Sequence, residues 1–179
     1  LHKLKDYDWV IEVIIENLDI KKKLYNNLAK SIGKDTILSS NTSTIPRSEL
    51  ISDMSNDLSS RFLITHFFNP PRYLPLLEVV SSPEVKQEVL DRFCIFAEIE
   101  LGKRVIMCND SPGFIGNRLG IYFIQRAYKA TIDHGLSIEQ ADAMLGRPIG
   151  LPKTAVFGLM DLVGIDLQKK IILKNTISF

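Results

Sequence analysis

His66 and Glu78 are the residues of this 179-residue sequence whose types and spacing best fit acid/base chemistry. An apolar run at 62–64 leads into His66, a proline-rich turn follows, and a second apolar run contains Glu78. This order predicts two buried strands joined by a tight loop, because proline cannot donate to a strand ladder. If the strands pair, the carboxylate can fix the imidazole tautomer and stabilise its charged form, as a general acid or base requires. The alternative is a core histidine satisfied by a nearby acid, and these residues alone slightly favour that alternative.

An alternation of strands and helices precedes this pair. The β-branched run 9–15 predicts a buried strand, which the charged Glu12 interrupts at a site or at the strand end. Apolar residues four apart within 19–31 predict an amphipathic helix with lysines on its exposed face. A short strand is expected at 36–40, and Pro46 suits the first turn of a short helix. The order of elements predicts an α/β fold.

Three polar residues stand just past the ends of the predicted strands: Glu16, Ser43 and His66. Ligands of α/β folds collect at the carboxyl ends of the strands, so this placement marks a candidate site. A helix is predicted at 84–101 and a last strand at 104–108. From Pro112 onward the apolar residues have the spacing of helices. We therefore place a domain boundary near Asn109.

Two further patterns belong to predicted helices. The helix at 84–101 turns Phe93 inward together with either Phe96 or Ala97, a choice that the period leaves open. Ser137 and Gln140 have the spacing of a capping box, which predicts a helix that begins after Ser137.

The composition limits the partners and the compartment. The net charge is +1 and no basic block stands out, so neither nucleic acid nor an anionic membrane surface is expected as a partner. Cys94 and Cys108 lack metal-ligand spacing, which indicates small buried hydrophobes in a reducing compartment and no metal site. No apolar run approaches the roughly 18 residues of a membrane span, and no signal-peptide pattern is present, so a cytoplasmic protein is expected.

A series of motifs runs from about Tyr7 to Asp166. They are Asp8-Trp9-Val10-Ile11-Glu12, Glu16-Asn17-Leu18 with Lys21, Ser40-Asn41-Thr42-Ser43, His66-Phe67-Phe68-Asn69-Pro70, Leu77-Glu78-Val79-Val80, and Asp110-Ser111-Pro112-Gly113-Phe114-Ile115 with Asn117-Arg118-Leu119. No single motif is decisive. In their shared order and spacing they resemble the 3-hydroxyacyl-CoA dehydrogenase family, the NAD-dependent enzymes of fatty-acid β-oxidation, both free-standing and fused to a crotonase part.

The resemblance implies a role for each matching residue. His66 would exchange a proton with the 3-hydroxyl of the substrate, and Glu78 would pair with His66. Ser43 and Asn117 would help to hold the substrate oxygen. The contacts to the cofactor, NAD, would fall on four residues: Glu16, Lys21, Asn41 and Asn69.

Four of these residues also have simpler structural explanations. Ser43 could be a turn residue that bonds its own backbone, and Asn117 a helix residue that faces the domain junction. Glu16 and Lys21 could belong to a solvated helix start, where an acidic residue is favoured.

The resemblance also implies the architecture. Residues 1–109 would form the C-terminal part of a Rossmann-type NAD-binding domain, followed by an incomplete all-α domain for substrate and dimerisation at 110–179. The ten glycines form no Gly-x-Gly-x-x-Gly, the phosphate-binding loop with which such a domain begins. We therefore expect a chain truncated at both ends that binds NAD poorly alone, and a separately encoded N-terminal fragment could restore the cofactor site.

Three hypotheses about function follow from the resemblance. In the first, the protein oxidises L-3-hydroxyacyl-CoA to 3-oxoacyl-CoA with NAD, as a homodimer formed through the helical domain. In the second, it is a non-catalytic remnant or half of a split enzyme that keeps the acyl-CoA cleft or the dimer surface. In the third, it is a related dehydrogenase that acts on a free hydroxy acid.

Overall fold

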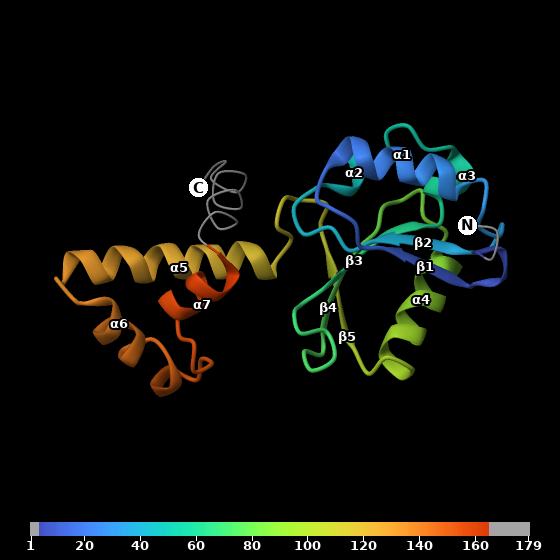
Figure 1. Ribbon diagram of the computed structural model, residues 1–179. Coiled ribbons are helices and arrows are strands. Elements are labelled where there is room, and N and C mark those ends of the chain that lie inside the picture. The colour runs from blue at the N-terminus through green and yellow to red at the C-terminus, as the bar shows by residue number, and fades with distance from the viewer. Residues whose placement is uncertain (1–3, 165–179) are drawn as a thin grey trace. The chain divides into compact units, whose positions relative to one another are not determined.

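The computed structural model describes residues 4–164 and divides into two compact units, of which the first ends at Ile115 and the second begins at Gly116 (Figure 1). The first unit contains, in chain order, η1 (Leu4–Asp6), β1 (Trp9–Glu12), α1 (Leu18–Leu28), β2 (Ile37–Ser40), α2 (Arg47–Ile51), α3 (Asn56–Ser59), β3 (Phe62–Phe67), β4 (Leu76–Val80), α4 (Gln87–Ile99) and β5 (Arg104–Cys108). The second unit contains α5 (Gly116–Asp133), α6 (Ile138–Met144), η2 (Arg147–Ile149) and α7 (Phe157–Val163). The last residues of the predicted helical domain, 165–179, lie outside the described residues.

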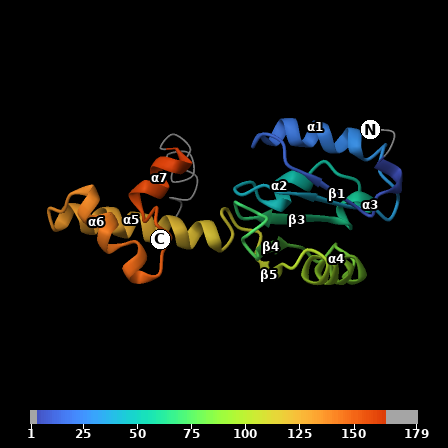
Figure 2. The same ribbon diagram turned by 60° about the horizontal axis from the view of Figure 1, so that its bottom comes forward.

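The five strands of the first unit form one sheet in the order β1-β2-β3-β4-β5. Neighbouring strands run parallel except β3 and β4, which are antiparallel. Helices α1 and α2 cover one face of the sheet and α4 covers the other, as two views of the ribbon show (Figure 1, Figure 2). This layered arrangement confirms the predicted α/β class.

Two apolar clusters hold the layers together. Successive strand residues point to opposite faces, so Phe62 of β3 packs with Tyr25 and Leu50 under α1 and α2, whereas the next residue, Leu63, packs against α4. On α4, Ala97 is fully buried whereas Phe96 is 38% exposed, which decides between the two inward positions that the sequence left open.

Two sequence predictions about the first strand and helix are wrong. The strand predicted over 9–15 ends at Glu12, and Val13 to Ile15 are exposed. The helix predicted with its lysines in solvent buries Lys21, which is 1% exposed, together with Tyr25. Both departures have one cause: the chain leaves the sheet at Glu12, and the buried face of α1 turns toward that carboxylate.

Polar side chains cap the starts of α6 and α7 in the second unit. The capping box predicted at Ser137 and Gln140 is confirmed, since each side chain accepts a hydrogen bond from the other residue's backbone N–H. Asp142 of α6 accepts hydrogen bonds from the N–H groups of Val156, Phe157 and Gly158, and so caps the start of α7. Among the described helices, none has the length and apolar character needed to cross a bilayer.

Candidate active site

His66 and Glu78 meet in the sheet. They are directly opposite each other in the antiparallel β3-β4 ladder, and His66 Nδ1 lies 2.8 Å from Glu78 Oε2. Both residues are buried, with exposed fractions of 6% and 0%. The predicted pairing is therefore confirmed as geometry. A carboxylate has no proton to donate, so Nδ1 carries the proton and the lone pair of the neutral ring lies on Nε2.

Aromatic rings and one backbone group fix this pair. The rings of Phe68 and Phe114 lie 4.6 and 5.7 Å from the His66 ring, measured between centroids. The second oxygen of Glu78, Oε1, accepts a hydrogen bond of 3.0 Å from the N–H of Ile115. The imidazole is thus packed on its sides, and its carboxylate partner is oriented through both oxygens.

The segment after β5 is held in place from a distant part of the chain. Asp110 accepts hydrogen bonds from the N–H groups of Arg47 (2.5 Å) and Ser48 (2.8 Å), and so caps α2. Beyond it the backbone turns sharply, with φ of 73° at Gly113 and 46° at Phe114. A positive φ is unfavourable for a residue with a Cβ, so tertiary contacts hold Phe114 in this conformation.

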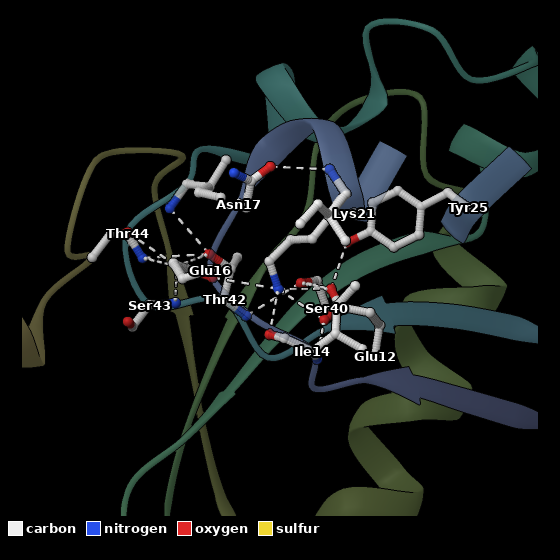
Figure 3. Close-up of polar contacts among 12 residues, drawn as sticks. Glu12, Ile14, Glu16, Asn17, Lys21, Tyr25, Ser40, Thr42, Ser43 and Thr44 are labelled. Atoms are coloured by element: carbon white, nitrogen blue, oxygen red, sulfur yellow. Dashed lines mark hydrogen bonds and ion pairs between the residues drawn. The ribbon is translucent and has the colours of Figure 1, made fainter. Parts of the chain in front are cut away.

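A second buried carboxylate, Glu12, lies at the end of β1. It accepts hydrogen bonds from Lys21 Nζ (2.8 and 3.0 Å), the Tyr25 hydroxyl (2.7 Å), the Ser40 hydroxyl (2.7 Å) and the N–H of Ile14 (2.6 Å). Figure 3 shows these groups converging from β1, α1 and β2. Burial, reinforced by the neighbouring Glu12 charge, raises the pKa of Tyr25 far above its ordinary value, so its hydroxyl remains a donor.

Glu16 organises the loop after β2. Its Oε1 accepts hydrogen bonds from the hydroxyls of Thr42 (2.5 Å) and Thr44 (3.0 Å) and from the N–H groups of Ser43 and Thr44, while Lys21 Nζ lies 3.3 Å from Oε2. Burial alone would raise the pKa of the Glu16 carboxyl, but the hydrogen bonds and the Lys21 charge together hold it below its ordinary value. Glu16 is therefore ionised near neutral pH, with its side chain one-third (33%) exposed.

The other predicted site residues are placed as follows. Asn41 joins three strands, because its N–H donates to the carbonyl of Glu12 and its side-chain oxygen accepts from the N–H of Phe67. Asn69 is exposed in the turn after β3. Asn117 lies in the first turn of α5, in the second unit, and its role in holding the substrate oxygen together with Ser43 stays a prediction. The structure brings together His66 with Glu78, and Glu16 with Lys21 and the backbone of Ser43.

Several residues of the site were missed in the sequence. Tyr25 and Ser40 complete the coordination of Glu12, and Phe114 packs on the histidine. A signal existed for the first of these, because Tyr25 follows Lys21 by four residues and so shares its helix face. The thiol of Cys108 is not a nucleophile here, because burial and, to a smaller extent, the Glu78 carboxylate raise its pKa to about 11.

Both units match models of a single protein family. The family model described as "3-hydroxyacyl-CoA dehydrogenase, NAD binding domain" matches residues 1–111. The model of the C-terminal domain of the same family matches residues 113–177. The two matches follow one another along almost the whole chain.

Individual relatives agree with these matches. A "probable 3-hydroxyacyl-CoA dehydrogenase" of Deinococcus radiodurans is 45% identical over 93% of this chain and 48% of its own length. The mitochondrial hydroxyacyl-coenzyme A dehydrogenase of Sus scrofa is 36% identical over 92% of this chain and 51% of its own length. The crystal structure of (S)-3-hydroxybutyryl-CoA dehydrogenase from Ralstonia eutropha superposes with a TM-score of 0.86 at 28% identity, covering 97% of this chain and 60% of that one. The chain spans about a quarter to about half the length of the curated relatives that it matches.

Proposed function

The chain belongs to the 3-hydroxyacyl-CoA dehydrogenase family, and we propose that this protein oxidises L-3-hydroxyacyl-CoA to 3-oxoacyl-CoA with NAD in fatty-acid β-oxidation. The observation that carries the proposal is the buried pair of His66 and Glu78, joined at 2.8 Å. Oxidation of a secondary alcohol needs a base for the hydroxyl proton, and a carboxylate-oriented imidazole meets that need near neutral pH.

In the proposed reaction, His66 takes the proton of the substrate 3-hydroxyl on Nε2. Nδ1 is held by Glu78, so only Nε2 has a lone pair for this transfer. The carboxylate of Glu78 fixes the ring and offsets the charge of the imidazolium that forms. Because Ile115 fixes the other Glu78 oxygen, the ring orientation depends on the segment that follows β5. Phe68 and Phe114 restrict the access of water to the ring.

Four residues are proposed to form the NAD site: Glu16, Lys21, Asn41 and Asn69. Their groups fit a dinucleotide, because carboxylate, ammonium and amide groups here follow the carboxyl ends of β1, β2 and β3, where α/β folds bind such ligands. The cofactor, when bound, accepts the hydride from the substrate. Glu16 is best placed for direct contact, being partly exposed and firmly held, whereas Lys21 is buried and orients Glu16 through their ion pair.

The remaining assignments concern the substrate and the dimer. We propose that Ser43 and Asn117 donate hydrogen bonds to the substrate oxygen, as neutral groups suited to a developing negative charge. We also propose that the helical unit forms a homodimer. In its support, α5 exposes several large apolar side chains: Leu119, Tyr122, Tyr128 and Ile132.

The test is a titration of the purified 179-residue chain with NADH, followed by cofactor fluorescence, and then an assay of acetoacetyl-CoA reduction. Saturable binding with turnover supports the proposal for the chain itself. A folded chain that neither binds nor turns over contradicts it and favours the non-catalytic alternative. Free acetoacetate serves as the control substrate, since reduction of the free acid at a similar rate would favour a hydroxy-acid dehydrogenase.

A further inference from the structure

A cavity of about 340 Å³ lies at the amino ends of β2 and β3, beside the first turns of α4. Arg61 of its lining comes directly before β3, whereas His66 lies near the other end of that strand. Five residues of extended chain separate the two by roughly 16 Å, so this cavity is distinct from the candidate active site. Its size matches that of small-molecule pockets.

Half of the eight residues that line the cavity are basic. Four basic side chains face two carboxylates, Asp35 and Glu88; the basic ones are Lys34, Arg61, Lys86 and Arg92. The lining thus has a formal charge of +2, compared with +1 for the whole chain. Within residues 4–164, neither the Lys34 nor the Lys86 ammonium lies within ion-pairing distance of a carboxylate, so no ion pair offsets the charge of these two lysines. Arg61, in contrast, is paired with Asp57, a carboxylate outside the lining, at 3.3 Å.

Several hydrogen-bond donors of the cavity wall lack acceptors. Arg61 is 7% exposed and donates from Nη1 to the carbonyl of Thr36 and from Nη2 to Asp57, while its Nε–H, which is shielded from solvent, has no acceptor in the described part of the chain. The N-cap residue of α4, Lys86, makes no side-chain capping bond. The first N–H groups of that helix are therefore also available, and a helix N-terminus favours an anion.

The wall is fixed before any ligand binds. The N–H of Lys86 donates to the carbonyl of Ser60 at 3.1 Å, which ties α4 to the start of β3. The guanidinium of Arg92 donates to the carbonyl of Asp35 at 2.6 Å, which ties α4 to the start of β2. A rigid wall lowers the entropic cost of binding.

We propose that this cavity is a binding site for a phosphate group, as free phosphate or as part of a small phosphomonoester. A phosphate group carries nearly two negative charges near neutral pH and several acceptor oxygens. Its negative charge therefore complements the two unpaired lysines of the lining, and its oxygens match the donors of Lys34, Lys86, Arg92 and the α4 N-terminus. The volume leaves room for a small organic group beside the phosphate.

Isothermal titration calorimetry at constant ionic strength tests this proposal with inorganic phosphate, glycerol 3-phosphate and glycerol. The test variant is Lys34→Gln/Lys86→Gln, whose lysines are exposed, so the fold should persist; circular dichroism checks this. The matched control is Lys23→Gln/Lys153→Gln, which removes the same charge at two exposed lysines outside the cavity lining.

We expect one phosphate per chain, bound roughly 10- to 100-fold more weakly by the test variant and about equally by the control. Tighter binding of glycerol 3-phosphate would identify a phosphomonoester as the ligand, and tighter binding of inorganic phosphate would identify the free ion. Absence of saturable binding to the folded chain, or equal weakening in both variants, would overturn the proposal. Neither result depends on NAD or on turnover.

Discussion

Glu12 and Glu78 are both buried carboxylates at the sheet, but their partners differ in kind. Glu12 is bound by the permanent cation Lys21, two hydroxyls and one backbone N–H. Glu78 is bound by an imidazole, whose other ring nitrogen can accept a proton, and by the N–H of Ile115. The first carboxylate therefore faces an ammonium group, whereas the second faces a group that can act as a base.

This difference separates a structural site from a chemical one. The partners of Glu12 are two side chains of α1 and one of β2, and their hydrogen bonds fix these elements to the end of β1. The partners of Glu78 come from β3 and from the segment after β5, and one of them can accept a proton. Substitutions at the first centre should therefore alter stability, and substitutions at the second should alter turnover.

The largest expected effect is the loss of activity in His66→Ala. Removal of the proposed base should lower kcat for acetoacetyl-CoA reduction by roughly 10²- to 10⁴-fold. The chain should stay folded, with a lower midpoint of urea unfolding, because alanine leaves the buried Glu78 carboxylate without its imidazole partner. Steady-state kinetics and urea unfolding measure the two quantities on the same sample.

His134→Ala is the matched control, because this histidine is exposed in the second unit. It should keep full activity and stability. If His66→Ala stays nearly fully active, His66 is not the base. If it unfolds instead, His66 is a core residue and the contrast between the two carboxylates fails.

Glu12→Gln should give the largest loss of stability. It leaves the buried Lys21 ammonium without its main counter-charge, and breaking a buried ion pair in this way costs about 3–5 kcal/mol in the free energy of unfolding. Urea unfolding followed by circular dichroism measures the loss. The double variant Glu12→Gln/Lys21→Met removes both charges and should lose less than the single variant.

The control for this prediction is Glu98→Gln, in which an exposed glutamate of α4 is neutralised. Its free energy of unfolding should change by less than about 0.5 kcal/mol. An equally small change in Glu12→Gln would mean that the buried network contributes little to stability. Glu12 and Glu78 would then not differ in what they contribute to stability.

The histidine pair could be predicted from sequence because its determinants are local. Two short apolar runs joined by a proline turn leave little choice of pairing, and the ladder places His66 opposite Glu78. The strand β5 was likewise predicted to the residue, at 104–108. Family resemblance then supplied the proposed roles, which periodicity alone does not give.

The buried network was predictable only in part, because its partners come from separate elements. Ile20 and Leu24 are four residues apart, and this spacing predicts that they lie on the buried face of the helix and that Lys21 lies in solvent. In the structure, however, Ile20 is 45% exposed and Lys21 is buried. Glu12 was the visible signal, as a charge inside an apolar run. Asp110 caps α2 although 63 residues of chain separate it from Arg47, and nothing in the neighbouring sequence predicts this contact.

The smallest expected effect is the pH dependence of stability at Glu16. Unlike Glu12 and Glu78, this carboxylate is partly exposed, and it accepts hydrogen bonds from two threonine hydroxyls. Its folded pKa lies below the ordinary value of 4.5, so the ionised carboxylate stabilises the fold; this contribution is complete above that value and is lost as the pH falls through the lowered pKa. Glu16→Gln should therefore be less stable than the native chain near neutral pH, by no more than about 1 kcal/mol because solvent screens the group, and the difference should shrink in acid. Urea unfolding as a function of pH measures it. A difference that stays constant with pH would show that the hydrogen bonds of Thr42 and Thr44, and not the charge of Glu16, hold the loop.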